Sequence, residues 1–163
     1  MGICPSELQH LVIRPTLEYL GEYSLAAQTL LVATAAVESE LGFHLKNEQG
    51  HGLGVYQISP RSHQYIWDQY LAKDPDMASK VRGLASQHEF LIQPHLELTT
   101  NLRYATAIAW MMYKRKNKAL PDANDTLALA KFWRRYFHRR PTNSINTFLE
   151  RYHRLIRESD IAA

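Results

Sequence analysis

The sequence predicts a single, mainly α-helical domain with a small β-hairpin element around residues 48–59. Three observations lead to this fold class. The length of 163 residues fits one compact domain. Apolar residues recur at helical spacing between capping residues along most of the chain. Only residues 43–59 lack this spacing, and no repeat, low-complexity tract or linker divides the chain, so we expect one domain over residues 1–163.

The first part of the chain predicts three helices. Ser6 can cap a first run, which Pro15 is expected to break while opening the next, and Gly21 ends that second helix. Ser24 then caps the most apolar helix of the chain, which Gly42 stops.

The segment after this helix carries glycines at alternating positions, Gly50, Gly52 and Gly54, followed by the strand-like "GVYQIS". Such glycines let the backbone approach a polymer closely or adopt positive φ. In a strand, Gln57 would share a face with Val55 and Ser59 and offer a sugar both a donor and an acceptor. The alternative is a plain hairpin with a polar face.

Capping residues mark the helices of the second part. A long helix with one apolar face is expected from Leu98 to Lys116, and a later helix ends before Pro141. The predicted N-caps are Ser59 and Asp74, each followed by proline, then Asp125, and finally Ser144 or Asn143.

The charge distribution limits the partners. Residues 1–113 hold seven Lys/Arg and eleven Asp/Glu, whereas residues 114–163 hold twelve and five. A basic half can attract nucleic acid, an anionic membrane or a cell-wall polymer, or it can be a solvated helix face. In "KFWRRYFHRR", helical spacing turns Phe132, Tyr136 and Trp133 inward and the arginines outward, so we do not expect nucleic acid as the partner.

Several site classes lack their motifs. One cysteine, Cys4, excludes an internal disulfide, and the eight histidines form no H-E-x-x-H pattern. Pro94 interrupts helical spacing between His88 and His95, so we expect no metal and no cofactor. No segment is apolar enough to span a bilayer, and the N-terminus does not resemble a secretory signal.

Glu38 is the candidate catalytic residue. Leu31, Thr34 and Ala35 lie one or two turns before it on the same face of an apolar helix, so we expect partial desolvation. Desolvation and the negative end of the helix dipole both favour the protonated carboxyl that a general acid needs. The alternative is a solvated charge in the last turn of a helix.

The pair Glu38-Ser39, followed by "GHGLGVYQISP" up to Pro60, resembles the core of the lysozyme-like superfamily. The similarity is to goose-type lysozymes and soluble lytic transglycosylases, in which an E-S pair precedes a glycine-rich segment and G-L-M-Q-hydrophobic-x-P. "RSH" after Pro60 is closest to the goose-type version, and Asn101-Leu102 resembles the N-I that opens the next helix. The family's Y-N-A-G-P has the degraded form "FHRRP" here, so the resemblance spans residues 24–141.

This resemblance implies a lysozyme-like fold and an enzyme that cleaves the β-1,4 bond between N-acetylmuramic acid and N-acetylglucosamine in peptidoglycan. Glu38 would be the general acid. Phe137 lacks the family's tyrosine hydroxyl, which Tyr136 or Tyr104 is expected to replace. The residues expected along the glycan groove are Ser39, Glu48, Gly54, Tyr56, Gln57, Ser59, Tyr104, Tyr136 and Phe137.

The mechanism depends on a second carboxylate, which hydrolases of this kind normally use. Glu48 stands at one position where goose-type lysozymes carry an acid, although it can equally be an exposed loop charge, and Ser59 replaces the other. The resemblance therefore favours a lytic transglycosylase, in which one glutamate acts as acid and then as base while the sugar's 6-hydroxyl attacks. The alternatives are a hydrolytic muramidase and a catalytically impaired, glycan-binding structural component.

The resemblance, together with the lack of a secretory signal, leads us to expect a bacteriophage protein. It would belong to the virion, with tail or capsid proteins as partners, or act as an endolysin from the infected host's cytoplasm on the periplasmic cell wall. Peptidoglycan glycan strands are the expected ligand. A helical nucleic-acid-binding protein is the remaining competing class, and only the basic C-terminal half favours it.

Overall fold

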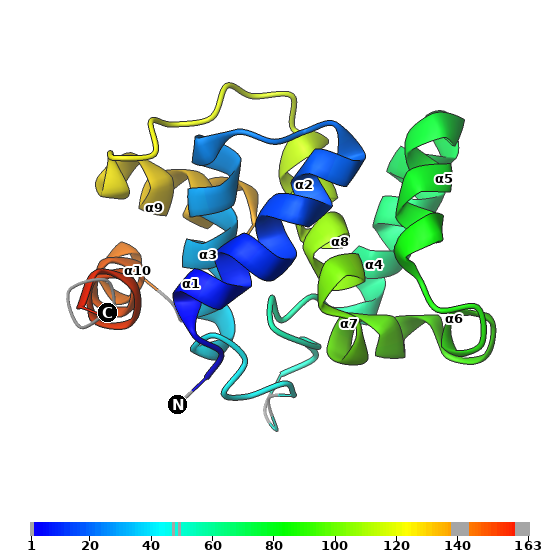
Figure 1. Cartoon of the computed structure of the whole chain (residues 1–163), viewed down its shortest axis with the longest axis horizontal. Helices are drawn as coiled ribbons and strands as arrows, with labels where there is room; N and C mark the ends of the chain where they lie inside the picture. The colour runs from blue at the N-terminus through cyan, green and yellow to red at the C-terminus, as the bar shows by residue number, and fades with distance from the viewer. Residues whose placement is uncertain (1, 47, 49, 138–143, 159–163) are drawn as a thin grey trace.

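The computed structural model describes residues 2–46, 48, 50–137 and 144–158, and helices account for most of them (Figure 1). The predicted mainly helical class is confirmed. Helices α3 (Leu25–Ser39) and α8 (Leu102–Lys114) lie centrally, with α9 (Thr126–Tyr136) and α10 (Ile145–Tyr152) on one side. The elements of the other side, called here the α4–α7 group, are α4 (Pro60–Tyr65), η2 (Ile66–Tyr70), η3 (Leu71–Lys73), α5 (Pro75–Leu84), α6 (Glu89–Ile92), η4 (Pro94–Leu96) and α7 (Glu97–Thr100).

The N-terminal helix runs without a break through α1 (Pro5–Glu7), the π-helical η1 (Leu8–Ile13) and α2 (Arg14–Leu20). The prediction that Pro15 breaks this run was wrong. The wider π-helical turn precedes the proline and accommodates a ring that would meet a carbonyl oxygen in a regular α-helix. The predicted N-cap Ser6 was also wrong, because the helix begins at Pro5 with Cys4 as its N-cap and Ser6 inside the first turn. Gly21, with φ 73°, ends the helix as predicted.

Helix α3 forms the centre of the core, and almost every side chain between Ala27 and Val37 is buried. The Ser24 hydroxyl caps it as predicted by accepting a hydrogen bond from the Ala27 backbone N–H at 3.1 Å. The helix ends in three consecutive left-handed residues, Glu40, Leu41 and Gly42, with φ values of 51°, 60° and 81°. The chain therefore reverses directly after Glu38 and Ser39.

The predicted β-hairpin around residues 48–59 is not present, and no described residue belongs to a strand. Leu53 forms only single antiparallel bridges, to Lys46 and to Ile58. Gly54 and Gln57 have φ values of 74° and 50°, which an extended strand cannot contain. A Cβ atom on Gly54 would lie 1.7 Å from the Leu98 carbonyl oxygen, so this loop packs directly against α7.

The remaining predicted caps are largely confirmed. Ser59, Asp74, Asp125 and Ser144 cap α4, α5, α9 and α10. The single long helix expected from Leu98 is instead divided at Asn101, whose side chain accepts from the Tyr104 N–H at 3.0 Å and starts α8. The predictions on Pro141 and Asn143 lie outside the described residues. After α10 the chain continues in η5 (His153–Arg157).

Candidate active site

Glu38 lies in the last turn of α3 with its side chain half-buried. The indole Nε1–H of Trp133 donates a hydrogen bond of 2.9 Å to its Oε1 atom. Trp133 comes from α9, is fully buried, and contacts the ring of Phe148 on α10 at a centroid distance of 5.4 Å. A rigid buried donor therefore holds one oxygen of a carboxyl that remains partly open to solvent.

Arginines of α10 and η5 hold the backbone around Glu38. Arg151 donates to the Val37 carbonyl oxygen and lies 3.5 Å from the Glu40 carboxylate. Arg154 reaches the same carboxylate at 3.3 Å. Cations at the C-terminus of a helix bind its last carbonyl groups and stabilise its dipole. Part of the basic C-terminal half thus has a structural function that its charge count did not predict.

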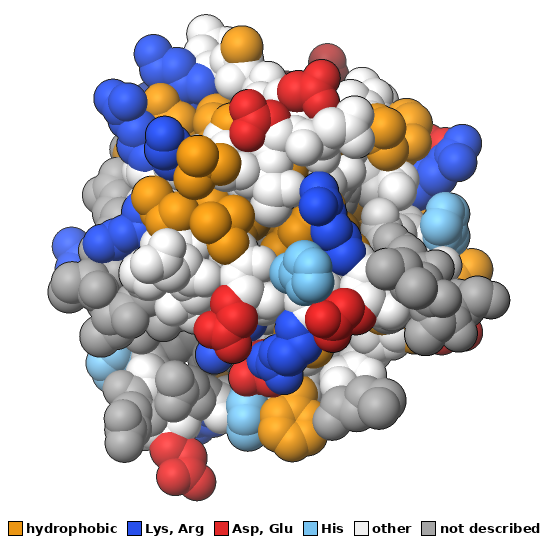
Figure 2. Space-filling view, turned by 90° about the vertical axis from the view of Figure 1, so that its left-hand side faces the viewer, with side chains coloured by type: hydrophobic (Ala, Val, Ile, Leu, Met, Phe, Trp, Pro, Cys, Tyr) orange, Lys and Arg blue, Asp and Glu red, His pale blue; other side chains and the backbone are white. Residues whose placement is uncertain are grey.

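The face that carries α9 and α10 is shown in Figure 2. Lys and Arg side chains gather around an apolar patch at its upper left, whereas acidic and basic side chains alternate in its lower part. The positive charge of this face is therefore concentrated at the upper left, whereas in the lower part acidic side chains balance the basic ones.

Ser39 is 3% exposed, and its hydroxyl is engaged with backbone groups. Its Oγ atom donates to the Val55 carbonyl oxygen at 2.6 Å and accepts from the Gly42 N–H at 2.8 Å. Ser39 therefore joins the end of α3 to the glycine-containing loop. These two hydrogen bonds hold the loop at Val55 against the end of the helix that carries Glu38.

Tyr56 and Gln57, neighbours in the loop, differ in environment. Tyr56 is fully buried, its hydroxyl lies 2.9 Å from Thr106 Oγ1 on α8, and burial raises the pKa of the phenol. Gln57 is half-buried, and its Nε2 donates to the carbonyl oxygens of Gly54 at 2.8 Å and of His44 at 3.3 Å. Of these two residues, only Gln57 has side-chain surface for a ligand.

Of the two positions considered for a second carboxylate, one carries an exposed acid and the other a capping serine. Ser59 Oγ caps α4, accepting from the Ser62 N–H at 3.1 Å and donating to Ser62 Oγ at 3.1 Å. Glu48 is exposed. The acid nearest to Glu38 in sequence, Glu40, is held by the two arginines described above.

Tyr104 and Tyr136 were the predicted replacements for a hydroxyl at Phe137. Tyr104 is buried in a separate cluster described below, and Tyr136 packs edge-on against Phe132 at 4.6 Å. No hydrogen bond among the described residues joins either tyrosine to Glu38. Trp133 on α9 instead donates to Glu38. It lies one helical turn before Phe137, and this spacing is the sequence signal that could have identified it.

An aromatic wall stands beside the helix that carries Glu38. Phe137 and Phe132 stack on Tyr113 at centroid distances of 5.2 and 5.7 Å. The Tyr113 hydroxyl lies 2.8 Å from Thr34 Oγ1, one turn before Glu38. Burial raises the pKa of Tyr113, a hydrogen bond with Thr34 opposes this rise, and the negative charge of Glu38 adds to it.

A second polar cluster lies where the α4–α7 group meets α8. Trp67 Nε1 donates to the Tyr104 hydroxyl oxygen at 2.8 Å, and that hydroxyl lies 2.6 Å from His63 Nε2. His63 Nδ1 lies 2.9 Å from His95 Nδ1. Because the Tyr104 oxygen accepts from Trp67, the consistent arrangement has Tyr104 donating to His63 and His63 donating to His95. Burial, followed by the nearby His95, lowers the pKa of His63 to about 4.

The described residues contain no group of three or more His, Cys, Asp or Glu side chains arranged to hold a metal ion. None of the described helices is both long and apolar enough to cross a membrane. No protein-family profile, no curated protein and no solved structure matches the chain.

Proposed function

We propose that this chain is a lysozyme-like, peptidoglycan-cleaving enzyme in which Glu38 acts as the general acid on the bond between N-acetylmuramic acid and N-acetylglucosamine. One observation carries the proposal: the half-buried Glu38 carboxyl receives a 2.9 Å hydrogen bond from the buried Trp133 indole at the end of the core helix. A positioned, partly desolvated carboxyl is the group that protonates a glycosidic oxygen. The E-S and G-x-x-Q resemblance supplies the substrate class.

We further propose the transglycosylase route, with a single carboxyl. Glu38 protonates the leaving oxygen and then accepts the proton of the sugar's 6-hydroxyl, which closes a 1,6-anhydro ring without consuming water. This route is supported by Ser59, which caps α4 where a hydrolase would carry an acid, and by Glu40, which is paired with Arg151 and Arg154. Gln57, on the loop behind Ser39, is the proposed glycan-contacting side chain.

Purified peptidoglycan tests both parts. We expect wild-type protein to release soluble fragments and Glu38→Gln to release about a thousandfold less, because a neutral amide is far too weak an acid to protonate the glycosidic oxygen. Mass spectrometry of the fragments then separates the routes, since a hydrolytic product is heavier by one water, about 18 Da. No release by the wild type contradicts the enzyme, and products without the anhydro ring support a muramidase instead.

A second candidate is a lysozyme-like phage component that binds glycan without turnover. Phe137 favours it, because this position lacks the hydroxyl of the Y-N-A-G-P motif and its ring stacks on Tyr113. Co-sedimentation with insoluble peptidoglycan, in the absence of soluble products, would support this function. Location in a virion, and contact with tail or capsid proteins, belong to the same proposal and are testable by mass spectrometry of purified particles.

A further inference from the structure

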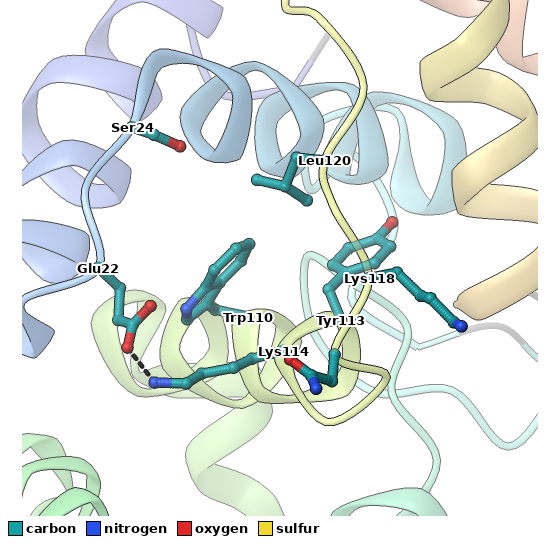
Figure 3. Close-up of a pocket in the computed structure, with 8 residues that line it drawn as sticks. Glu22, Ser24, Trp110, Tyr113, Lys114, Lys118 and Leu120 are labelled. Atoms are coloured by element: carbon teal, nitrogen blue, oxygen red, sulfur yellow. Dashed lines mark hydrogen bonds and ion pairs between the residues drawn. The ribbon is translucent and has the colours of Figure 1, made fainter.

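Helix α8 borders two polar regions of the molecule. In its C-terminal half, Trp110 and Tyr113 line a pocket that also holds the ion pair of Glu22 with Lys114 (Figure 3). Tyr113 is also part of the aromatic wall of the proposed active site, so this pocket adjoins that site. Tyr104, about 14 Å away along the helix axis, belongs to the second polar cluster, which the proposed mechanism does not use.

Residues 86–96, called here the strap, connect α5 to α7 and form the lower right-hand edge of the molecule in Figure 1. The two short helical elements of the strap, α6 and η4, contain no buried residue. Its two ends are tied together, because Glu97 accepts hydrogen bonds from the backbone N–H and the hydroxyl of Ser86. Asn101 donates to Glu97 and to the Leu84 carbonyl oxygen, both at 2.8 Å. A loop with joined ends can move without unfolding the helices on either side.

Two side chains hold the strap against the rest of the protein. Phe90 packs edge-on against the rings of Tyr104 and Trp67, at centroid distances of 5.9 and 5.7 Å. His95 Nδ1 lies 2.9 Å from Nδ1 of His63, which is 1% exposed. The polar part of this attachment is therefore a hydrogen bond between two imidazole rings.

This hydrogen bond depends on the protonation of both rings. When both are neutral, one Nδ1 atom donates and the other accepts. When both are protonated, each Nδ1 carries a hydrogen, so the bond is lost and two positive charges face each other. Burial, followed by the nearby His95, lowers the pKa of His63 to about 4. Acid therefore favours a state in which the strap has moved away and His63 is hydrated.

The other charged and titratable groups near the two rings come from three neighbouring helices. Glu97 on α7 is buried, and its negative charge favours the protonated His63, but the burial of the imidazole outweighs this effect. Burial raises the pKa of Tyr104 on α8, so its phenol stays neutral. Arg82 on α5 lies 4.3 Å from the Phe90 ring centroid and adds positive charge beside the strap. The surroundings therefore offer a protonated pair a single buried carboxylate.

We infer that the strap is an acid-operated latch, which the hydrogen bond between His63 and His95 closes at neutral pH and which protonation of this pair releases. Release withdraws Phe90 and uncovers the surfaces of α4, η2 and α8 beneath it. The ends of the strap stay joined through Glu97, so the change is a local opening that leaves α3 in place. The latch does not depend on the function proposed for Glu38.

Amide hydrogen exchange of the full chain, corrected for the intrinsic effect of pH, measures this opening. The strap amides to follow are those of Gln93 and Leu96, which donate to the carbonyl oxygens of Glu89 and Gln93 at 2.7 and 3.0 Å. Their protection is expected to fall about twentyfold from pH 7 to pH 5, as for one histidine whose pKa rises from about 4 to 6.5 on release. Low urea concentrations should leave strap exchange unchanged, because a local opening exposes little surface, and should accelerate exchange in α3.

Three histidine variants identify the group responsible. His63→Gln removes the titrating ring but keeps a polar group for the Tyr104 hydroxyl, so we expect equal strap protection at pH 7 and pH 5. His95→Leu is expected to lower strap protection about fivefold at pH 7, the equivalent of one hydrogen bond. His88→Gln changes an exposed histidine of the strap, which pairs with Glu89, and should keep the wild-type pH dependence.

The wild type alone can overturn the inference, whether or not the variants fold. Equal strap protection at pH 7 and pH 5 contradicts the latch, and so do strap amides that exchange in step with those of α3 in urea. Among the variants, a His63→Gln strap that still loosens in acid assigns the effect to another group and also overturns the inference.

Discussion

Two tryptophan indoles donate hydrogen bonds to functional groups of very different character. Trp133 donates to Glu38, a half-buried carboxyl at the end of α3. Trp67 donates to the hydroxyl oxygen of Tyr104, which is fully buried and lies within hydrogen-bond distance of His63. The first pair presents a group to solvent, where the proposed substrate would bind, whereas the second closes a network inside the protein. Equivalent donors can therefore position a reactive group or stabilise a core, depending on whether the acceptor reaches the surface.

The largest expected effect is on peptidoglycan cleavage, and it distinguishes the Trp133–Glu38 pair from the Trp67–Tyr104–His63 cluster. Glu38→Gln is expected to lower peptidoglycan cleavage by about a thousandfold, within the usual contribution of a general acid. It should leave the free energy of unfolding nearly unchanged, because the amide oxygen still accepts from the Trp133 indole. Fragment release from purified peptidoglycan and urea denaturation measure the two quantities.

Glu48→Gln is the control for this change, since Glu48 is an exposed acid of the loop. We expect it to retain wild-type cleavage. A comparable loss in Glu48→Gln would contradict the single-carboxyl mechanism and favour hydrolysis.

The converse pattern is expected for Tyr104→Phe in the buried cluster. Removal of the hydroxyl leaves the Trp67 N–H without its acceptor and His63 Nε2 without its donor. Unsatisfied buried groups cost about 1–3 kcal/mol each, so we expect a loss of about 3 kcal/mol of stability in urea denaturation, with kcat unchanged. A Tyr104→Phe variant that folds normally but loses activity would show that this cluster also serves the active site.

The same cluster predicts a pH dependence of stability. His63 has a folded pKa of about 4 against an ordinary value of 6.5, so the unfolded chain binds more protons between these values. Its contribution is therefore fully present above about pH 6.5 and is lost as the pH falls toward 4, amounting to about 3 kcal/mol. Denaturation curves at several pH values measure this, with His88→Gln as the control because His88 is exposed. A wild-type stability that stays constant between pH 6.5 and 4 would contradict it.

Local chemistry made much of the helical framework predictable. Ser24, Asp74 and Asp125 cap their helices as expected, because a short side chain needs only the backbone three residues ahead. The course of residues 48–59 was not predictable in this way. Whether Gly54 bends the chain or extends it depends on the distant Leu98 carbonyl, against which the loop packs.

In the candidate site, too, local features were predictable from the sequence and long-range contacts were not. The position of Glu38 at a helix end followed from its helix alone, whereas its partner Trp133 lies 95 residues away and was assigned only an inward orientation. Ser39, Tyr56 and Tyr104 carried polar atoms that the sequence presented as ligand groups. Tertiary packing directs those atoms to backbone and to buried side chains instead.

A smaller effect tests the role of Trp133 itself. Trp133→Phe keeps an aromatic ring in the core but removes the N–H that binds Glu38. We expect kcat to fall about tenfold, the equivalent of one hydrogen bond to a charged group, with KM little changed. Trp110→Phe is the matched control, since its indole N–H has no described partner. Equal activity losses in the two variants would indicate general loosening of the core.

The smallest expected effect concerns the contact between the proposed acid's helix and the loop. Ser39→Ala removes a hydroxyl that binds the Val55 carbonyl oxygen and the Gly42 N–H. We expect the free energy of unfolding, measured by urea denaturation, to fall by about 1–2 kcal/mol, because the Val55 carbonyl and the Gly42 N–H both lose a buried hydrogen-bond partner. If Gln57 contacts glycan, the loosened loop raises KM more than it lowers kcat, which separates this change from Trp133→Phe. Ser62→Ala is the comparison and should leave KM unchanged, since among the described residues Ser62 Oγ hydrogen-bonds to the α4 cap residue Ser59 alone. A fall in kcat alone for Ser39→Ala would assign Ser39 to the orientation of Glu38 and not to the loop.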